Sequence, residues 1–297
     1  MGPSTLHDLA PESPALPAAP PSVLRALNAV QHRLEACAHQ PGQPRGGDPA
    51  HLRATARELL HAIDLSADVA LACVLRNQVA GSYAMRHSIE TAVVAALVGR
   101  HLHMRPVHLL STVSAALALH ATGRHDGPQQ DRRMSQAVHC VGDAETEWFA
   151  CLLADHAPEI LSPAETVAAA LLRMADRYCA GVSPRNYRRA LLPADALARV
   201  LEQSPPAELA TAFAQEIGPY PPGTIVRLAA GDIAVVTHRD GSRPEVLCLR
   251  DGAARTYTVP LPRRVGEDGC AIAAALGEDD HEVRLAMKQV WGPLASL

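Results

Sequence analysis

Aromatic residues are scarce in this 297-residue chain, at 3% of the sequence, although hydrophobic residues make up 48%. Alanine, leucine and valine must therefore fill most of the core, and small side chains of this kind favour closely packed helices. Lysine is almost absent too, because Lys288 is the only one, and there is no run of basic residues. With a net charge of -4, the chain lacks the basic surface typical of nucleic-acid-binding proteins, so we expect no nucleic-acid partner.

Cysteine pairs at metal-binding spacing are also missing. The seven cysteines stand singly, with no C-x-x-C pair: Cys37, Cys73, Cys140, Cys151, Cys179, Cys248 and Cys270. An odd number of isolated cysteines predicts buried thiols in a reducing compartment. No apolar run approaches the ~20 residues of a membrane span, and the first residues lack the basic-then-apolar pattern of a signal peptide. We therefore expect a cytoplasmic protein with no membrane partner.

Apolar residues at helical spacing occupy most of the chain up to Ile217. Residues 1–21, dense in Pro, Ala and Ser, predict a disordered leader. Residues 22–65 predict two N-terminal helices, which form either a cap or dimerisation element, consistent with a homodimer, or simply extra cover for the core. Further helices are predicted at Ala67–Asn77, Ser82–Leu102, Val107–Ala121, 143–155, from Val167 onward, Leu192–Leu201 and Pro206–Ile217.

The periodicity changes after Gly218. Short β-branched runs alternate with glycine-containing turns, which predicts a small antiparallel sheet of three or four strands. Residues 266–297 show only weak apolar periodicity and are left without an assigned structure. The expected fold class is therefore mainly α, a helical bundle followed by a small antiparallel β subdomain.

Asp176 interrupts a predicted helix that is apolar on almost every side. A carboxylate in a packed apolar region needs a hydrogen-bonded partner, a cation or a metal. An ion pair with Arg173 or Arg177 on the same helix satisfies this need, and so does a metal ion.

The segment around Asp176 resembles the end of the helical core of HD-GYP domains, the bacterial metal-dependent phosphohydrolases of the HD type that are associated with cyclic di-GMP hydrolysis. The similar residues are ADRYCAGVSPRNYRRALLPADAL, 175–197. Residues 217–236, IGPYPPGTIVRLAAGDIAVV, resemble the small extension that follows that core. The likeness covers roughly residues 86–236, and it implies an HD-domain-like helical domain over 66–217 and a β-rich extension over 218–297.

The same resemblance implies a set of metal ligands. Two of the family's ligand residue types occur at the matching positions of this sequence. His87, in the sequence RHS, matches the family's first histidine, and Asp176 matches its last aspartate. A histidine on an apolar helix is also commonly a core residue bonded to a carbonyl, so both interpretations of His87 stay open.

Two other ligand motifs depart from the family pattern. Leu119 and His120 stand where the His-Asp doublet belongs, and leucine cannot coordinate a metal. Asp155 and His156 stand at the two histidines of a His-His-Glu motif, and no Gly-Tyr-Pro loop follows them.

The remaining candidate metal ligands are His87, His120, Asp155, His156 and Asp176. Imidazole and carboxylate groups suit a single Mn, Fe or Zn ion. A site with two or more metals, which would activate water and neutralise phosphoryl charge, would lack its bridging ligands. We therefore expect no cofactor, with one divalent metal as the alternative.

Arg185 and Arg188 are candidate contacts for a phosphate, because a guanidinium group matches phosphate oxygens with two hydrogen bonds. Their alternative role is structural, as a helix cap or an ion pair near Asp195 and Glu202.

The expected function is that of a catalytically degenerate HD-GYP-like regulatory protein, which binds a protein partner or a ligand in bacterial cyclic di-GMP signalling. Two alternatives stay open. One is a metal-dependent phosphohydrolase of the cyclic di-GMP phosphodiesterase type with an altered, single-metal site. The other is a cyclic di-GMP sensor that does not hydrolyse its ligand.

Overall fold

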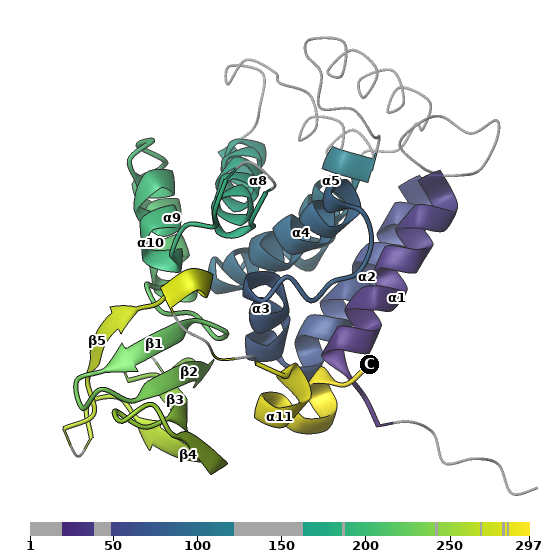
Figure 1. The fold of residues 1–297 in the computed structure, drawn as a ribbon. Coiled ribbons are helices and arrows are strands. Elements are labelled where there is room, and N and C mark those ends of the chain that lie inside the picture. Colours follow the sequence, from purple (N-terminus) through teal and green to yellow (C-terminus); the bar gives the residue numbers. More distant parts are fainter. Residues whose placement is uncertain are drawn as a thin grey trace, which may run out of the picture.

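The protein consists of a helical region followed by a small antiparallel sheet, as the sequence predicts (Figure 1). The structure is a computed structural model, and it describes residues 20–38, 49–121, 163–185, 188–240, 243–267, 269–280, 283 and 285–297. Almost all of the predicted leader and the helix predicted at 143–155 lie outside these residues. None of the described helices is long and apolar enough to cross a bilayer.

The helices begin and end within a few residues of the predicted positions. They are α1 (Val23–Ala38), α2 (Pro49–Leu65), α3 (Ala67–Leu75), α4 (Tyr83–His101), α5 (Pro106–Ala121), α8 (Pro163–Val182), α9 (Pro193–Leu201) and α10 (Ala207–Ile217). Local sequence signals set several of these ends. The hydroxyl of Ser66 accepts a hydrogen bond from the Val69 amide and starts α3, and Ser82 does the same for Met85 at the start of α4.

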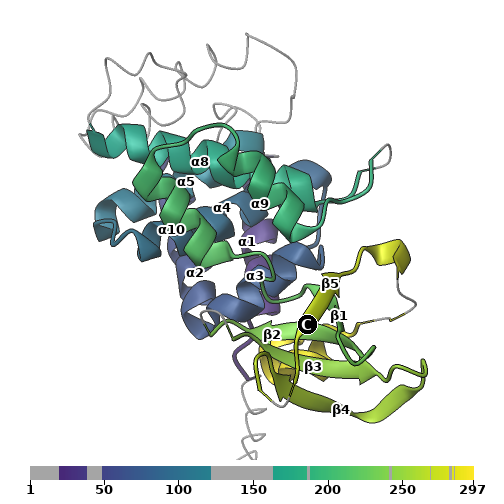
Figure 2. The same ribbon diagram turned by 90° about the vertical axis from the view of Figure 1, so that its left-hand side faces the viewer.

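Helix α4 lies at the centre of the helical region (Figures 1 and 2). It packs against α1, α3, α5, α8 and α10. Small residues on several of its sides, including Ala92, Ala95 and Ala96, are fully buried, which is how a helix enclosed by others is built. Two aromatic residues complete the neighbouring core, since the rings of Tyr178 and Phe213 meet edge to face with their centroids 5.8 Å apart.

The two N-terminal helices belong to the same hydrophobic core as α4. Val23, Leu27 and Leu59 are fully buried in it. The C-terminal end of the chain returns to this place as α11 (Met287–Trp291) and the 3₁₀ helix η3 (Gly292–Ala295). There the Ser22 hydroxyl, at the start of α1, donates a 2.5 Å hydrogen bond to the Ser296 carbonyl.

The sheet has five strands in the order β4-β3-β2-β1-β5, each antiparallel to its neighbours. The strands are β1 (Ile225–Leu228), β2 (Ile233–His238), β3 (Glu245–Arg250), β4 (Thr256–Arg264) and β5 (Ile272–Ala275). The prediction of three or four strands was therefore too low. Strand β5 was missed because its alanine-rich sequence has little preference for a strand, and it forms only by pairing with β1, far away in the chain.

Several contacts fix the sheet against the helices, and two of them lie after β2 and before β1. After β2, Arg239 donates hydrogen bonds to Asp68 at the start of α3, at 2.7 Å, and to the carboxylate of Glu216 near the end of α10, at 2.6 Å. Before β1, Gly223 passes so close to α3 that a Cβ atom there would lie 3.1 Å from the Ala72 Cα. The sheet is thereby held beside α3 at one end of the helical region (Figure 2).

Candidate functional site

Helices α4 and α8 bring together the first and last ligand positions that the family resemblance implies. The Nε2 atom of His87 on α4 and the Oδ1 atom of Asp176 on α8 lie 2.8 Å apart, in hydrogen-bond contact. His87 is 2% exposed and the Asp176 side chain 35% exposed, so solvent reaches the pair only from the side of the carboxylate. The expectation that Asp176 is enclosed by apolar residues was therefore correct only in part.

One helical turn further along α4, Glu90 is completely buried. Its Oε2 atom accepts a 3.0 Å hydrogen bond from the hydroxyl of Ser183, just beyond α8, and the Arg86 guanidinium lies 3.5 Å from its Oε1 atom. Burial raises the pKa of Glu90 to about 8, because Ser183 and Arg86 only partly offset the loss of hydration. Burial thus favours the protonated form of Glu90 at neutral pH.

Sequence reasoning did not select Glu90. The available signal was a single acidic residue in the apolar stretch SIETAVVAALV. Because such a residue faces neighbouring helices, it needs a partner from another part of the chain, and the spacing within α4 does not reveal that partner.

Tyr83 links the contacts between α4 and α8 to the loop after α8. Its ring stacks on the His87 imidazole, with centroids 5.4 Å apart and an angle of 11° between the planes. The Nη2 atom of Arg185 donates a 2.6 Å hydrogen bond to the Tyr83 hydroxyl, and the guanidinium carbon lies 4.9 Å from the ring centroid. Burial raises the pKa of Tyr83 in spite of the opposing effect of Arg185. The phenol is therefore a neutral hydrogen-bonding group.

The two candidate phosphate-binding arginines form the ends of a tight hairpin. The backbone amide of Arg185 donates to the Arg188 carbonyl at 2.8 Å, and the amide of Arg188 donates to the Arg185 carbonyl at 3.0 Å. The Arg188 guanidinium donates to the carbonyl of Ala180, in the last turn of α8. This contact satisfies a helix-terminal carbonyl, which is the capping role considered as the alternative.

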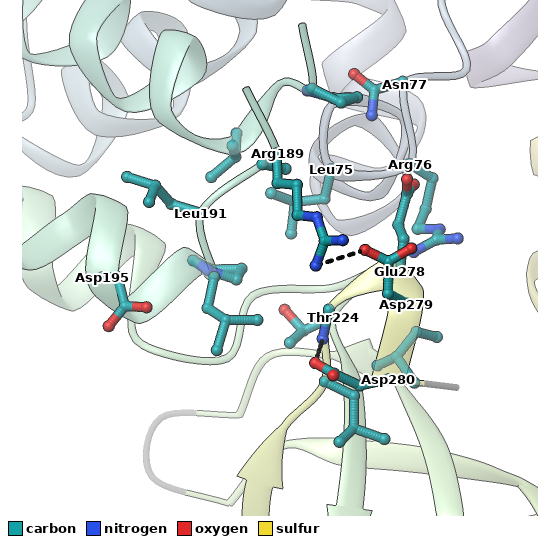
Figure 3. Close-up of a pocket in the computed structure, with 18 of the residues that line it drawn as sticks. Leu75, Arg76, Asn77, Arg189, Leu191, Asp195, Thr224, Glu278, Asp279 and Asp280 are labelled. Carbon is teal, nitrogen blue, oxygen red and sulfur yellow. Dashed lines mark hydrogen bonds and ion pairs between the residues drawn. The ribbon is translucent and has the colours of Figure 1, made fainter. Parts of the chain in front are cut away.

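A cleft of about 620 Å³ opens between this hairpin, the end of α3 and the sheet (Figure 3). Its helical wall carries Asp195 of α9 and four basic residues: Arg76, Arg185, Arg188 and Arg189. Acidic residues from the 3₁₀ helix η2 (Glu278–Asp280) line the opposite wall. Cavities of a few hundred Å³ suit small-molecule ligands, and the cleft lies between two structural units, where such ligands commonly bind.

The other candidate metal ligands fall where the structure gives no side chains. Asp155 and His156 lie outside the described residues, and Leu119 and His120 belong to α5 without a described side chain. Among the residues that are described, no three His, Cys, Asp or Glu side chains come close enough together to hold a metal ion. Within this part of the chain the candidate donors in contact are therefore the pair His87 and Asp176.

The cysteines in the described part of the chain do not favour thiol chemistry either. The cysteines whose surroundings are described are free and buried: Cys73, Cys179, Cys248 and Cys270. For these residues the prediction of buried thiols is confirmed. Burial raises the pKa of Cys73 to about 12 and that of Cys179 well above its ordinary value, so neither forms the thiolate that a nucleophile requires.

Comparison with protein-family models, with curated proteins and with solved structures finds no match to this chain.

Proposed function

We propose that this chain is a non-hydrolytic regulatory protein, in which an HD-GYP-like helical domain binds a ligand or a protein partner. The observation that carries the proposal is the direct contact between His87 and Asp176. These residues match metal ligands in the resemblance, and here their donor atoms lie in hydrogen-bond contact with each other.

The physical argument rests on the donor atoms. The hydrogen bond joins the Nε2 atom of His87 to a carboxylate oxygen of Asp176, and these are the atoms that would otherwise bind a metal. A cation placed between them would have to replace this bond and still find further ligands. In addition, Leu119 stands where the family pattern has the histidine of its His-Asp doublet, and leucine has no donor atom.

A binding role agrees with the shape of the protein. The cleft beside the Arg185–Arg188 hairpin has the volume of a small-molecule site, and no step of hydrolysis is needed to use it. The link to cyclic di-GMP signalling in a bacterial cytoplasm comes from the resemblance alone and forms part of the proposal.

The test is a hydrolysis assay with cyclic di-GMP in the presence of Mn²⁺ or Fe²⁺, together with metal analysis of the purified protein. We expect no turnover above a blank for the wild-type chain and no metal in stoichiometric amount. Turnover that Asp176→Ala abolishes and Asp64→Ala leaves intact would refute the proposal. Asp64 is the matched control because it is an exposed acidic residue that pairs with Arg100 on the surface.

A single-metal phosphohydrolase is the second candidate. It is favoured by the side-by-side position of one imidazole and one carboxylate that solvent can reach. If it is correct, one equivalent of Mn, Fe or Zn binds to the wild-type chain and is lost in both His87→Ala and Asp176→Ala.

A cyclic di-GMP sensor is the third candidate, favoured by the position of Arg185 and Arg188 on the wall of the cleft. Calorimetry with cyclic di-GMP separates it from a purely protein-binding role, since a sensor releases or absorbs heat in a saturable titration and a protein-binding module does not.

A further inference from the structure

The arginines that line the cleft between the helices and the sheet differ in their hydrogen-bond and ion-pair partners. Arg185 and Arg188 bind the Tyr83 hydroxyl and the Ala180 carbonyl, respectively, so their guanidinium groups hold the hairpin in place. Arg76, at the end of α3, and Arg189, just after the hairpin, instead approach the acidic helix η2 from two sides (Figure 3).

Arg189 is held by an exposed ion pair. Its Nη1 atom lies 3.0 Å from the Oδ2 atom of Asp279, and the two side chains are 87% and 65% exposed. Ion pairs as exposed as this contribute little to stability, because water and salt screen the attraction and both side chains lose freedom. An anion that offers two oxygens to the Arg189 guanidinium can therefore displace Asp279 at little cost.

Arg76 lines the cleft together with Glu278 of η2 (Figure 3). Burial lowers the pKa of Arg76, and the nearby carboxylate of Glu278 offsets this effect without cancelling it. A partly buried guanidinium in this state gains from a second anion beside it.

The third acidic residue of η2 has a different role. The Oδ2 atom of Asp280 accepts a 2.9 Å hydrogen bond from the Gly277 amide, and the Asp280 amide donates to the Gly277 carbonyl at 3.1 Å. These bonds close the turn on itself. They hold Glu278 and Asp279 on the wall of the cleft without using the carboxylates of these two residues.

We propose that the cleft binds a small phosphate-bearing ligand between Arg76 and Arg189, and that Asp279, assisted by Glu278, is an internal competitor for these guanidinium groups. The proposal rests on the binding role given above, and it adds the ligand chemistry and its regulation. The volume of about 620 Å³ accommodates a nucleotide as well as a simple phosphate. The acidic helix sets a threshold, because ligand must reach a concentration at which it outcompetes the carboxylates.

The experiment is isothermal titration calorimetry of the full-length chain with inorganic pyrophosphate at low ionic strength. We expect Arg189→Gln to weaken binding roughly tenfold, as the loss of one charged contact does. We expect Asp279→Asn to tighten binding by about three- to tenfold, because it removes the competitor and keeps the size of the side chain. We expect Arg76→Gln to weaken binding as well. The circular dichroism spectrum and melting temperature of this variant are measured to check that it folds.

A matched control comes from the sheet. Arg264 and Glu245 form another exposed pair, with Arg264 Nη2 2.7 Å from Glu245 Oε1, and neither lines the cleft. Arg264→Gln and Glu245→Gln should leave the affinity for pyrophosphate unchanged. Saturable binding is lost in high salt, as expected for an ionic site.

Three results would overturn the proposal: no saturable heat with millimolar pyrophosphate, unchanged affinity in Arg189→Gln, or Asp279→Asn binding no tighter than the wild-type chain. A parallel titration with cyclic di-GMP identifies the source of the phosphate. The same responses to Arg189→Gln and Asp279→Asn assign the site to a nucleotide, whereas binding of pyrophosphate alone assigns it to a smaller phosphate compound.

The outcome is separable from that of the hydrolysis assay. Turnover of cyclic di-GMP that depends on Asp176 would contradict the non-hydrolytic role. Such turnover would not change the expected calorimetric responses of the Arg189 and Asp279 variants to pyrophosphate. Conversely, a cleft that binds no pyrophosphate removes this inference and leaves a protein-binding role intact.

Discussion

Glu90 and Ser183 share a 3.0 Å hydrogen bond, and both side chains are completely buried where α4 meets the end of α8. The carboxyl group sits one helical turn from the His87–Asp176 contact. Its proton avoids the cost of a buried negative charge, so the packing of α4 against α8 depends on protonation.

The first prediction is that stability falls as pH rises from about 4.5 to about 8. The pKa of Glu90 is 4.5 in the unfolded chain and about 8 in the folded one, so in this interval the folded protein binds one more proton than the unfolded chain. The free energy of unfolding then decreases by up to about 1.4 kcal/mol per pH unit and levels off above pH 8.

Urea unfolding at several pH values measures this dependence. Glu90→Gln keeps an acceptor for Ser183 and removes the titration, so we expect a much flatter profile for this variant. Glu58→Gln serves as the control, because Glu58 is an exposed residue that pairs with Arg33. An unchanged pH profile in Glu90→Gln would show that another group causes the dependence.

The second prediction concerns the direct contact between His87 and Asp176. A double-mutant cycle with His87→Ala and Asp176→Ala should give a coupling free energy of about 1 kcal/mol, reduced from the value for a fully buried pair because the carboxylate is partly exposed. The same cycle on Arg100 and Asp64, which are more exposed, should give less than about 0.5 kcal/mol.

Metal addition gives this second prediction a further readout. A protein whose His87 and Asp176 satisfy each other keeps its melting temperature when Mn²⁺ or a chelator is added. A rise with Mn²⁺ in the wild-type chain that is absent in Asp176→Ala would instead indicate a bound cation, because ligands that bind only the folded state stabilise it.

The helices could be predicted well from the sequence, and the site only in part. The bounds of α4 and α8 follow from apolar spacing and caps such as Ser82, which are local signals. The sequence singled out both His87 and Asp176, which lie in contact with each other. Glu90 and the cleft could not be foreseen, because the groups that define them come from distant parts of the chain.

The cleft shows the reason clearly. Arg76, Arg189 and Asp279 belong to α3, the loop after α8 and the segment after β5, and they meet only because the sheet docks beside α3. Strand β5, which carries η2 to this place, has an alanine-rich sequence without a strand signal. Long-range pairing therefore decided both the strand and the site.

The third prediction is that Arg239 holds the sheet on the helices. Burial lowers the pKa of Arg239, and Glu216 and Asp68 more than offset this effect and raise it. Arg239→Met keeps most of the apolar stem and removes the guanidinium that bridges the two carboxylates, which retain their contacts with His238 and His101. We therefore expect a loss of about 2 kcal/mol in the free energy of unfolding.

Chemical unfolding measures the loss at Arg239, and hydrogen exchange shows whether β2 loses protection before the helices do. Arg264→Met is the matched control, because Arg264 pairs with Glu245 at 2.7 Å with both side chains more than 40% exposed. It should cost less than about 1 kcal/mol. Equal losses in the two variants would mean that the junction at Arg239 has no special role.

The fourth prediction isolates the close approach of Gly223 to α3. Both Gly223 and Gly269 have left-handed backbone angles, with φ of +96° and +72°, but a Cβ on Gly223 would lie 3.1 Å from the Ala72 Cα, whereas one on Gly269 would meet nothing within 4 Å. Gly269→Ala should therefore cost about 1 kcal/mol, for backbone strain alone. Gly223→Ala should cost about 2–4 kcal/mol in urea unfolding, because the sheet must also move away from α3. Since Gly223 lines the cleft, this movement should also weaken the binding of pyrophosphate. Equal losses of stability in the two variants would show that the sheet is not held tightly against α3.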